Sequence, residues 1–319
     1  MPSLKHLLTA GLAAAIGFAS LAAQTTVFED TFASSTLNST SPAAPTSTST
    51  AYQLVSSKAW NPEPSISAGS LKFGIAATSS GHIEAHALFS ATPVQLLNVG
   101  EYIELTLTFT NTSGLLTNAS HLGIGLYDAN GVQPVAGGLP ETAVSGSTTH
   151  ASGGAKDWKG YVNRIFYAGG NNKLVTRPAQ TGSNNTNQAL LTEGSSSQSY
   201  QNPGGTNVGS NASSSLTLVA GSQYTYSLKI ALTAASTYQI DTALYAGTNT
   251  SGTSLYTQSG TASGGTFITT AFDALAIGWR STATATGATA IEVHSIKVVT
   301  NSASYVPPTP AAPIITTQP

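Results

Sequence analysis

The chain has no cysteine and few charged residues, and both absences restrict what it can be. Without cysteine in its 319 residues, folding cannot rely on disulfides, so the domain needs a core large enough to be stable by itself. The 11 basic and 13 acidic residues make 24 charged residues in all, about a third of the usual fraction. A surface built mostly from Ser, Thr, Asn, Gln and Gly argues against binding to nucleic acid and against electrostatic docking onto a membrane. It suits an uncharged, hydroxyl-rich ligand, or no ligand at all.

Apolar runs long enough to span a membrane are also absent after the first residues. Lys5 and His6 precede an apolar run over 7–22, which ends among small residues before Gln24. This pattern predicts a signal peptide over 1–23 with a helical apolar segment, cleaved after Ala22 or Ala23, and a retained anchor is the alternative. We therefore expect a secreted or cell-surface protein with no membrane insertion after cleavage. Export without disulfides favours a bacterial source.

Regular alternation of apolar and polar residues is the clearest positive feature. It covers 101–110 and again 224–233, and such alternation indicates half-buried β-strands. The apolar sides of these two strands are predicted to be buried opposite each other. One side consists of Ile103, Leu105, Leu107 and Phe109, and the other includes Tyr226, Leu228 and Ile230.

Further strands are predicted where similar runs are bounded by turn residues. About a dozen result, more than a seven-stranded immunoglobulin sandwich needs, so we predict an all-β fold of two antiparallel sheets in a jelly-roll sandwich over 24–300. The short connection 233–237 predicts a hairpin, and a phase shift near His294 and Ser295 predicts a β-bulge. A long Gly-, Ser- and Asn-rich insertion, 137–215, is expected to carry only short strands. The predicted strands are 26–32, 52–56, 71–76, 82–89, 101–110, 121–127, 161–167, 173–176, 215–219, 223–233, 237–245, 254–258, 272–279 and 290–299.

The last residues, 301–319, differ in composition from the rest of the chain. They contain Pro307, Pro308, Pro310 and Pro313 and no charge, which predicts a Pro-rich linker. The terminal stretch 312–319 resembles the opening strand of immunoglobulin-like modules in secreted multidomain proteins. Further modules after Pro319 are therefore a possibility that the sequence leaves open.

Three segments together resemble the concanavalin A-like (laminin G-like) jelly roll. They are Phe-Glu-Asp-Thr-Phe at 28–32, the turn into a strand at 65–73, and the closing strand 291–299. The resemblance covers roughly 26–300 and implies that the first and last strands lie side by side. It also implies a tendency to bind carbohydrate, and it transfers no catalytic residue.

His82, Glu84 and His86 form the sharpest polar group in the chain. Their spacing places all three side chains on one face of a strand. On a concave face they could line a sugar cleft, or the two histidines could hold a metal, and the alternative is a solvated polar face. The two-carboxylate chemistry of glycosidases needs a second acid within reach. The Glu-x-Asp-x-x-Glu motif of jelly-roll glucanases is absent, and a partner such as Glu104 cannot be placed from sequence.

Trp158, Tyr161 and Tyr167 form an aromatic island inside the polar insertion. Aromatic rings stack on the apolar C–H surface of sugars while amides such as that of Asn163 bond the hydroxyls. The sequence therefore predicts ligand binding by these four residues. The alternative is that Trp158 and Phe166 anchor the insertion onto the sandwich.

Glu29 and Asp30, near the first strand, are candidates for a Ca²⁺ site, because hard cations need several oxygen ligands. Asp128, Asp241 and Asp273 are possible distant partners. No other cofactor is indicated.

We therefore interpret the chain as a secreted, non-catalytic domain for binding polysaccharides or other glycans, or for surface adhesion. The first alternative is a polysaccharide-degrading enzyme, a hydrolase or lyase, that uses the face of His82, Glu84 and His86. The second alternative is a structural spacer or surface-layer component, which the low charge and the Pro-rich tail favour.

Overall fold

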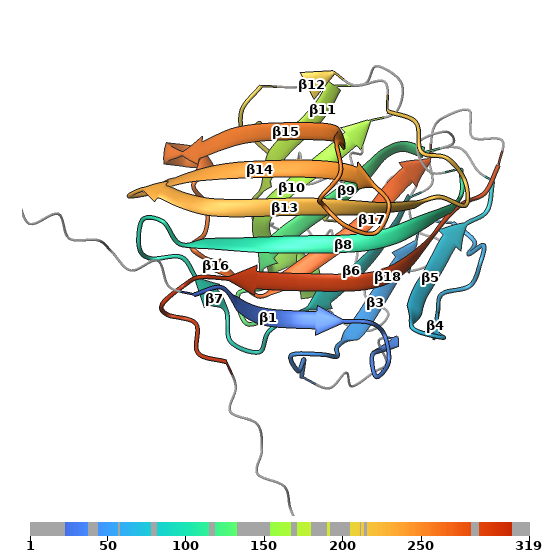
Figure 1. Cartoon of the computed structure of the whole chain (residues 1–319), viewed down its shortest axis with the longest axis horizontal. Helices are drawn as coiled ribbons and strands as arrows, with labels where there is room; N and C mark the ends of the chain where they lie inside the picture. Colours follow the sequence, from blue (N-terminus) through green and yellow to red (C-terminus); the bar gives the residue numbers. More distant parts are fainter. Residues whose placement is uncertain are drawn as a thin grey trace, which may run out of the picture.

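Two β-sheets packed face to face make up the described part of the molecule (Figure 1). The structure is a computed structural model, and it describes residues 23–37, 44–56, 58–77, 82–114, 119–132, 154–166, 171–179, 190–191, 205–210, 212–213, 216–281 and 287–307. Within these residues the only helical elements are two short 3₁₀ turns, η1 (Gly154–Asp157) and η2 (Gly264–Thr266). No helix among them is long and apolar enough to cross a membrane. The predicted all-β sandwich is confirmed.

The sheet nearer the viewer in Figure 1, here called the front sheet, contains eight strands. Its order is β15-β14-β13-β8-β18-β5-β4, and β1 pairs with β18. The bounds are β15 Ser254–Ser263, β14 Thr237–Ala246, β13 Gln223–Ala234, β8 Tyr102–Ser113, β18 Thr289–Thr300, β5 Ser70–Ile75, β4 Ser65–Ser67 and β1 Thr25–Asp30.

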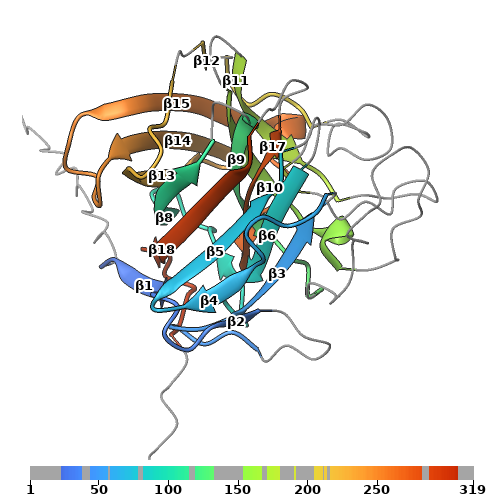
Figure 2. The same ribbon diagram turned by 90° about the vertical axis from the view of Figure 1, so that its right-hand side faces the viewer.

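The second sheet, here called the back sheet, also contains eight strands in the order β12-β11-β10-β9-β17-β6-β3-β2. Seen after a 90° turn, it runs from β11 and β12 at the top to β3 and β2 below (Figure 2). All its pairings are antiparallel except that of β2 with β3, and β7 with β16 forms a separate small ladder. The bounds are β12 Ala212–Ser213, β11 Asn171–Arg177, β10 Lys159–Phe166, β9 Ala119–Asp128, β17 Ala274–Ser281, β6 His82–Leu88, β3 Ala51–Ser56, β2 Thr36–Leu37, β7 Val94–Gln95 and β16 Ala271–Phe272.

The two strands with the clearest alternation are neighbours in the front sheet, and the predicted burial of their apolar sides is confirmed. Leu107 lies opposite Tyr226, Leu105 opposite Leu228, and Ile103 opposite Ile230. All of these side chains are buried in the core between the sheets. A one-residue slip would turn every apolar side chain of a strand toward solvent, so this burial fixes the register.

Two local irregularities were also predicted correctly. The pairing of β18 with β8 shifts between Val293 and Ser295, which is the expected bulge. The hairpin between β13 and β14 closes through Ser236, whose φ of 58° is in the left-handed region. The first and last long strands lie side by side, with Thr25 opposite Thr300, as the resemblance implied.

The predicted strand over 215–219 is the clearest error in the fold. Residues 216–219 have no strand partner, although Leu216 and Leu218 are buried. Instead the Asn111 side-chain amide donates to the Leu218 carbonyl oxygen at 2.9 Å, and the Val219 amide donates to the Tyr224 hydroxyl at 2.7 Å. Side chains therefore satisfy part of this backbone, and alternating burial occurs without a neighbouring strand.

The chain remains packed beyond the predicted end of the domain at residue 300. The Asn301 side chain accepts the Tyr102 amide at 2.7 Å and donates to the Gly100 carbonyl oxygen at 3.0 Å. Tyr305 is also buried. The first residues of the predicted linker therefore belong to the packed domain, whereas residues 1–22 of the predicted signal peptide and residues 308–319 of the predicted linker lie outside the described residues.

Candidate functional site

The predicted stripe of His82, Glu84 and His86 lies on β6, on the side of the back sheet that faces away from the front sheet. The intervening Ile83 and Ala85 are part of the core between the sheets. Glu84 and His86 are fully buried, at 0% exposure, and His86 Nε2 donates to Glu84 Oε2 at 2.7 Å. The side chain of His82 lies outside the described residues. The outer face is therefore covered at this point, and it is neither a solvated face nor an open cleft.

Part of this cover is a two-residue piece of the chain's own insertion, Leu190–Leu191. The Leu190 amide donates to Glu84 Oε2 at 2.8 Å, and the Leu191 amide donates to Glu84 Oε1 at 3.1 Å. The Tyr127 hydroxyl donates to the Leu190 carbonyl oxygen at 3.2 Å. His121 Nε2 lies 3.2 Å from the Leu191 carbonyl oxygen, which can only accept. Side chains of the back sheet thus bind every backbone polar group of the segment.

Gly123 on the outer face leaves the space beside Leu191. Gly278 of β17 lies in register with Glu84 on one side and Gly123 of β9 on the other, and Arg164 of β10 is the next in line. A Cβ atom on Gly123 would lie 2.9 Å from the Leu191 Cβ. We call this row the glycine slot. It consists of Glu84, Gly278, Gly123 and Arg164.

Trp158 is fully buried in the same outer-face cluster. Its indole nitrogen donates to the Val132 carbonyl oxygen at 2.9 Å, and its ring lies 6.2 Å from that of Tyr127. Its own carbonyl oxygen accepts from Arg177. Burial lowers the pKa of Arg177 to about 10, against the opposing effect of Tyr127, Glu84 and Asp157. The ring has no exposed face for a sugar, so its position fits the alternative of an anchor.

Tyr161 and Asn163 lie on the opposite side of the back sheet from Trp158, in the core between the sheets. The Tyr161 hydroxyl donates to the Thr266 carbonyl oxygen at 2.9 Å. The Asn163 side chain bonds the Tyr226 hydroxyl at 3.1 Å and Gln258 Oε1 at 2.9 Å. The structure therefore separates the predicted aromatic island and encloses both residues. Tyr167 lies outside the described residues, and its role in stacking stays a prediction.

The carboxylates proposed for calcium are already engaged. Asp30 accepts from the Phe32 amide at 2.6 Å, the Ser35 hydroxyl at 2.6 Å and the Tyr52 hydroxyl at 2.7 Å. Glu29 is ion-paired with Lys297 at 2.8 Å. Asp241 accepts from Gln239 and Ser259 on β14 and β15. Among the described residues no group of three or more His, Cys, Asp or Glu could hold a metal, so the donor set around Glu29 and Asp30 does not fit Ca²⁺.

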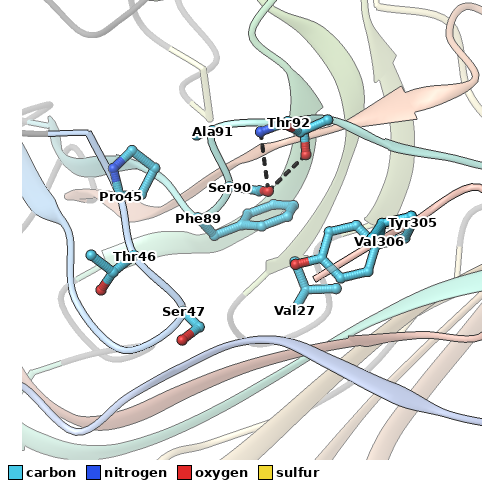
Figure 3. A pocket seen from close by; sticks show the side chains of 10 residues that line it. All are labelled: Val27, Pro45, Thr46, Ser47, Phe89, Ser90, Ala91, Thr92, Tyr305 and Val306. Atoms are coloured by element: carbon cyan, nitrogen blue, oxygen red, sulfur yellow. Dashed lines mark hydrogen bonds between the residues drawn. The ribbon is translucent and has the colours of Figure 1, made fainter. Parts of the chain in front are cut away.

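A groove at the end of β6 was not predicted from the sequence. It has a volume of about 110 Å³, and the turn Ser90–Thr92 forms part of its lining (Figure 3). In Figure 3 the Phe89 ring lies between Pro45 on one side and Tyr305 on the other. We call it the Ser90 groove, and it is lined by Val27, Pro45, Thr46, Ser47, Phe89, Ser90, Ala91, Thr92, Tyr305 and Val306.

The Ser90 groove combines apolar and hydroxyl groups without charge. The Ser90 hydroxyl donates to the Thr92 carbonyl oxygen at 2.7 Å, which holds the turn (Figure 3). Thr46, Ser47 and Thr92 are exposed. Burial raises the pKa of the Tyr305 hydroxyl, against the opposing effect of a hydrogen bond with Ser90. Tyr305, the one titratable residue in this lining, is therefore uncharged at neutral pH.

A second hollow of about 120 Å³ adjoins the groove and shares Pro45, Ser90 and Ala91 with it. It is also lined by Leu88, Ala129 and Asp273. Burial raises the pKa of Asp273 to about 7, with a further contribution from Asp128 and an opposing hydrogen bond from the Ala129 amide. Because Leu88 and Ala129 also belong to the outer-face cluster with Trp158, the hollow lies at the end of the covered face.

No single stretch of sequence identifies the groove. Its lining comes from β1, the loop before β3, the β6–β7 turn and the segment after β18, each of which contributes one to four ordinary residues. Asp273 was singled out only as a distant calcium candidate. The one sequence signal of the cover is Leu190–Leu191 itself, an aliphatic pair in an otherwise polar stretch.

No family model matches the chain, and no curated protein matches it either. Among solved structures it is similar to peanut lectin with a nine-residue peptide, with a TM-score of 0.44 and 11% identity over 88% of this chain and 98% of the lectin. It is similar to the exoplasmic/lumenal domain of VIP36 in its Ca²⁺- and Man₃GlcNAc-bound form, with a TM-score of 0.41 and 8% identity over 81% and 86%. Lectin II from Ulex europaeus matches with a TM-score of 0.40 and 12% identity over 78% and 92%. Because these identities are so low, the description of the sandwich rests on the strand order of this chain itself.

Proposed function

We propose that this chain is a non-catalytic binding domain for an uncharged glycan, and that the Ser90 groove holds the end of that glycan. The observation that supports the proposal is the lining of the groove, which places the apolar side chains of Pro45, Ala91 and Val306 beside the hydroxyl groups of Thr46, Ser47 and Thr92. Sugars present apolar C–H faces and hydroxyls together, so such a lining matches both. Asp273, at the adjoining hollow, supplies a carboxyl group that can donate to or accept from a sugar hydroxyl.

The size of the groove limits the ligand to a small contact. About 110 Å³ corresponds to the volume of about four water molecules, so the groove can enclose only part of one sugar ring. Affinity should therefore be modest, and it should barely change with salt, because no charged side chain lines the groove itself. A fall in affinity of about tenfold between low and physiological salt would contradict an uncharged ligand.

Binding can be tested with a glycan array of neutral polysaccharides and a variant that fills the groove. Ala91 is exposed on the rim, so Ala91→Trp should obstruct the groove without altering the core, and we expect affinity to fall at least about tenfold. The matched control is Thr248→Trp, exposed on the connection between β14 and β15. Equal binding by the two tryptophan variants would contradict the proposed site.

Hydrolysis is the second candidate function, and one observation favours it. Asp273, with its pKa raised to about 7, is in the protonation state that a general acid needs near neutral pH. A glycosidase also needs a second carboxylate, and the neighbouring Asp128 accepts from Thr269 and pairs with Lys159 at 3.4 Å. Release of reducing ends from a bound polysaccharide by the parent, and its loss in Asp273→Asn, would establish hydrolysis in place of simple binding.

We also propose that the protein acts outside the cytoplasm after removal of residues 1–22 or 1–23. The support is the N-terminal pattern, in which Lys5 and His6 precede the apolar run over 7–22 and small residues precede Gln24. Mass spectrometry of the protein recovered from the host's culture medium or cell surface should find an N-terminus at Ala23 or Gln24. Recovery of the intact N-terminus from the cytoplasm would contradict export.

A further inference from the structure

The contacts of Leu190–Leu191 are those of a bound peptide. A single carboxylate, Glu84, accepts both successive amides through its two oxygens, at 2.8 and 3.1 Å. Two side chains of β9, Tyr127 and His121, bond the two carbonyl oxygens at 3.2 Å each. Backbone normally pairs with backbone or water, whereas here four side-chain contacts from two strands satisfy the amides and carbonyl oxygens of two successive residues.

The apolar contacts of the segment are equally specific. Both leucine side chains are fully buried in the outer-face cluster. The space beside Leu191 exists because Gly123 has no side chain. Glu84 is itself fully buried, and a buried carboxylate is costly unless donors surround it. The two amides of the segment supply two of these donors and His86 supplies a third.

We propose that the glycine slot is a recognition site for an extended dipeptide with aliphatic side chains, and that Leu190–Leu191 occupies it as an intrachain ligand. The site would accept a separate extended peptide with aliphatic side chains when the chain's own segment is displaced. This inference is independent of glycan binding at the Ser90 groove.

Tethering explains how such a site can remain closed to other peptides. A segment that belongs to the same chain as its site competes at an effective concentration on the order of millimolar. A free dipeptide with the same contacts would therefore compete only at millimolar concentration. The parent protein should show no binding of such a peptide at micromolar concentration.

The proposal can be tested by displacing the segment and supplying the peptide separately. In the double variant Leu190→Gly and Leu191→Pro, the first leucine side chain and the amide that donates to Glu84 Oε1 are lost. We expect this full-length variant to bind N-acetyl-Leu-Leu-amide with a millimolar dissociation constant, measured by NMR titration or calorimetry. N-acetyl-Leu-Pro-amide, which lacks the second amide, should bind at least about tenfold more weakly.

The role of Glu84 is tested in the same background. Adding Glu84→Gln exchanges one carboxylate oxygen for an amide group that cannot accept, so affinity for N-acetyl-Leu-Leu-amide should fall at least about tenfold. A folded double variant that binds neither peptide, or binds both equally, would show that Leu190–Leu191 only anchors the insertion and would overturn the proposal.

A measurement on the parent protein keeps the proposal testable if the double variant fails to fold. With N-acetyl-Leu-Leu-amide at tens of millimolar, hydrogen exchange of the Leu190 and Leu191 amides should accelerate severalfold. Amides of β8 and β13 in the front sheet provide the control and should be unaffected. Unchanged exchange at Leu190 and Leu191 under these conditions would count against a site that accepts a second peptide.

Discussion

The outer faces of the two sheets carry similar alternating polar residues but differ in what covers them. On β8 of the front sheet, Glu104 and Thr106 are partly exposed, and Glu104 lies opposite Lys229 of β13. On β6 of the back sheet, Glu84 and His86 follow the same two-residue period and are fully buried. Alternation therefore identifies the face on which a side chain lies, but it does not show whether that face meets solvent.

The physical chemistry of the two faces differs accordingly. Water satisfies a partly exposed carboxylate such as Glu104, so its protein contacts contribute little to stability. Glu84 has no such access, and its burial is tolerated because amides of Leu190 and Leu191 and the His86 ring donate to it. A polar group on the covered face is thus coupled to a segment about a hundred residues away. Four predictions test this difference.

The largest effect is expected for removal of the carboxylate on the covered face. Glu84→Ala leaves two buried amides without an acceptor, at about 1–3 kcal/mol each, so the free energy of unfolding should fall by about 3–5 kcal/mol. The matched variant Glu104→Ala on the front sheet should lose less than about 1 kcal/mol. Urea unfolding of both variants measures the difference, and equal losses would show that the two faces are energetically alike.

A pH effect is expected where the covered face ends at the second hollow. The pKa of Asp273 is raised to about 7 from its ordinary 3.8, so the folded state favours the protonated form. Its contribution is complete below about pH 4 and is lost as the pH rises through about 7, on the order of 4 kcal/mol. Asp273→Asn should flatten the dependence of unfolding free energy on pH between 4 and 8. An unchanged slope would mean that Asp273 does not titrate in this range.

A smaller effect is expected from adding one methyl group to the floor of the glycine slot. Gly123→Ala places a Cβ atom 2.9 Å from that of Leu191, and relieving this contact should cost about 1–3 kcal/mol. Gly252→Ala, which meets nothing within 4 Å, should change stability by less than about 0.5 kcal/mol. Thermal unfolding of the two alanine variants distinguishes a filled slot from an open face, where both would behave like Gly252→Ala.

The smallest effect is expected on the open face of the front sheet. Glu29 and Lys297 form an exposed ion pair between β1 and β18, and such pairs contribute about 0–1 kcal/mol. Glu29→Gln should therefore lower the melting temperature by no more than a few degrees. Because the donor set around Asp30 is already engaged, added Ca²⁺ or a chelator should not change it further. A calcium-dependent rise that Glu29→Gln abolishes would restore the metal site predicted from sequence.

The fold was predictable where burial has a period of two residues. The strands β8, β13, β14 and β18 were located to within about three residues because each has one face in the core and one in water. The stretch 215–219 also alternates, yet it has no strand partner. Alternation indicates which side chains are buried. In this segment Leu216 and Leu218 are buried by packing against the sandwich, without strand pairing.

The candidate sites were less predictable because both depend on contacts between distant segments. The sequence placed Glu84 and His86 together on one face, which is correct, but the cover provided by Leu190–Leu191 follows no periodic pattern. It also grouped Trp158 with Tyr161, although the back sheet separates them. The Ser90 groove is assembled from residues between Val27 and Val306. No local pattern could indicate a surface whose lining is brought together only by the closed sandwich.

The pairing of β1 with β18 has a mechanical consequence. Thr25 lies opposite Thr300, and from there the two strands run antiparallel toward Asp30 and Ile296. A force applied through the two ends of the sandwich would therefore pull on one pair of residues at a time. Rupture would proceed by unzipping from Thr25, with each hydrogen bond loaded in turn, so the first strand should detach at low force while the two-sheet core behind it remains folded.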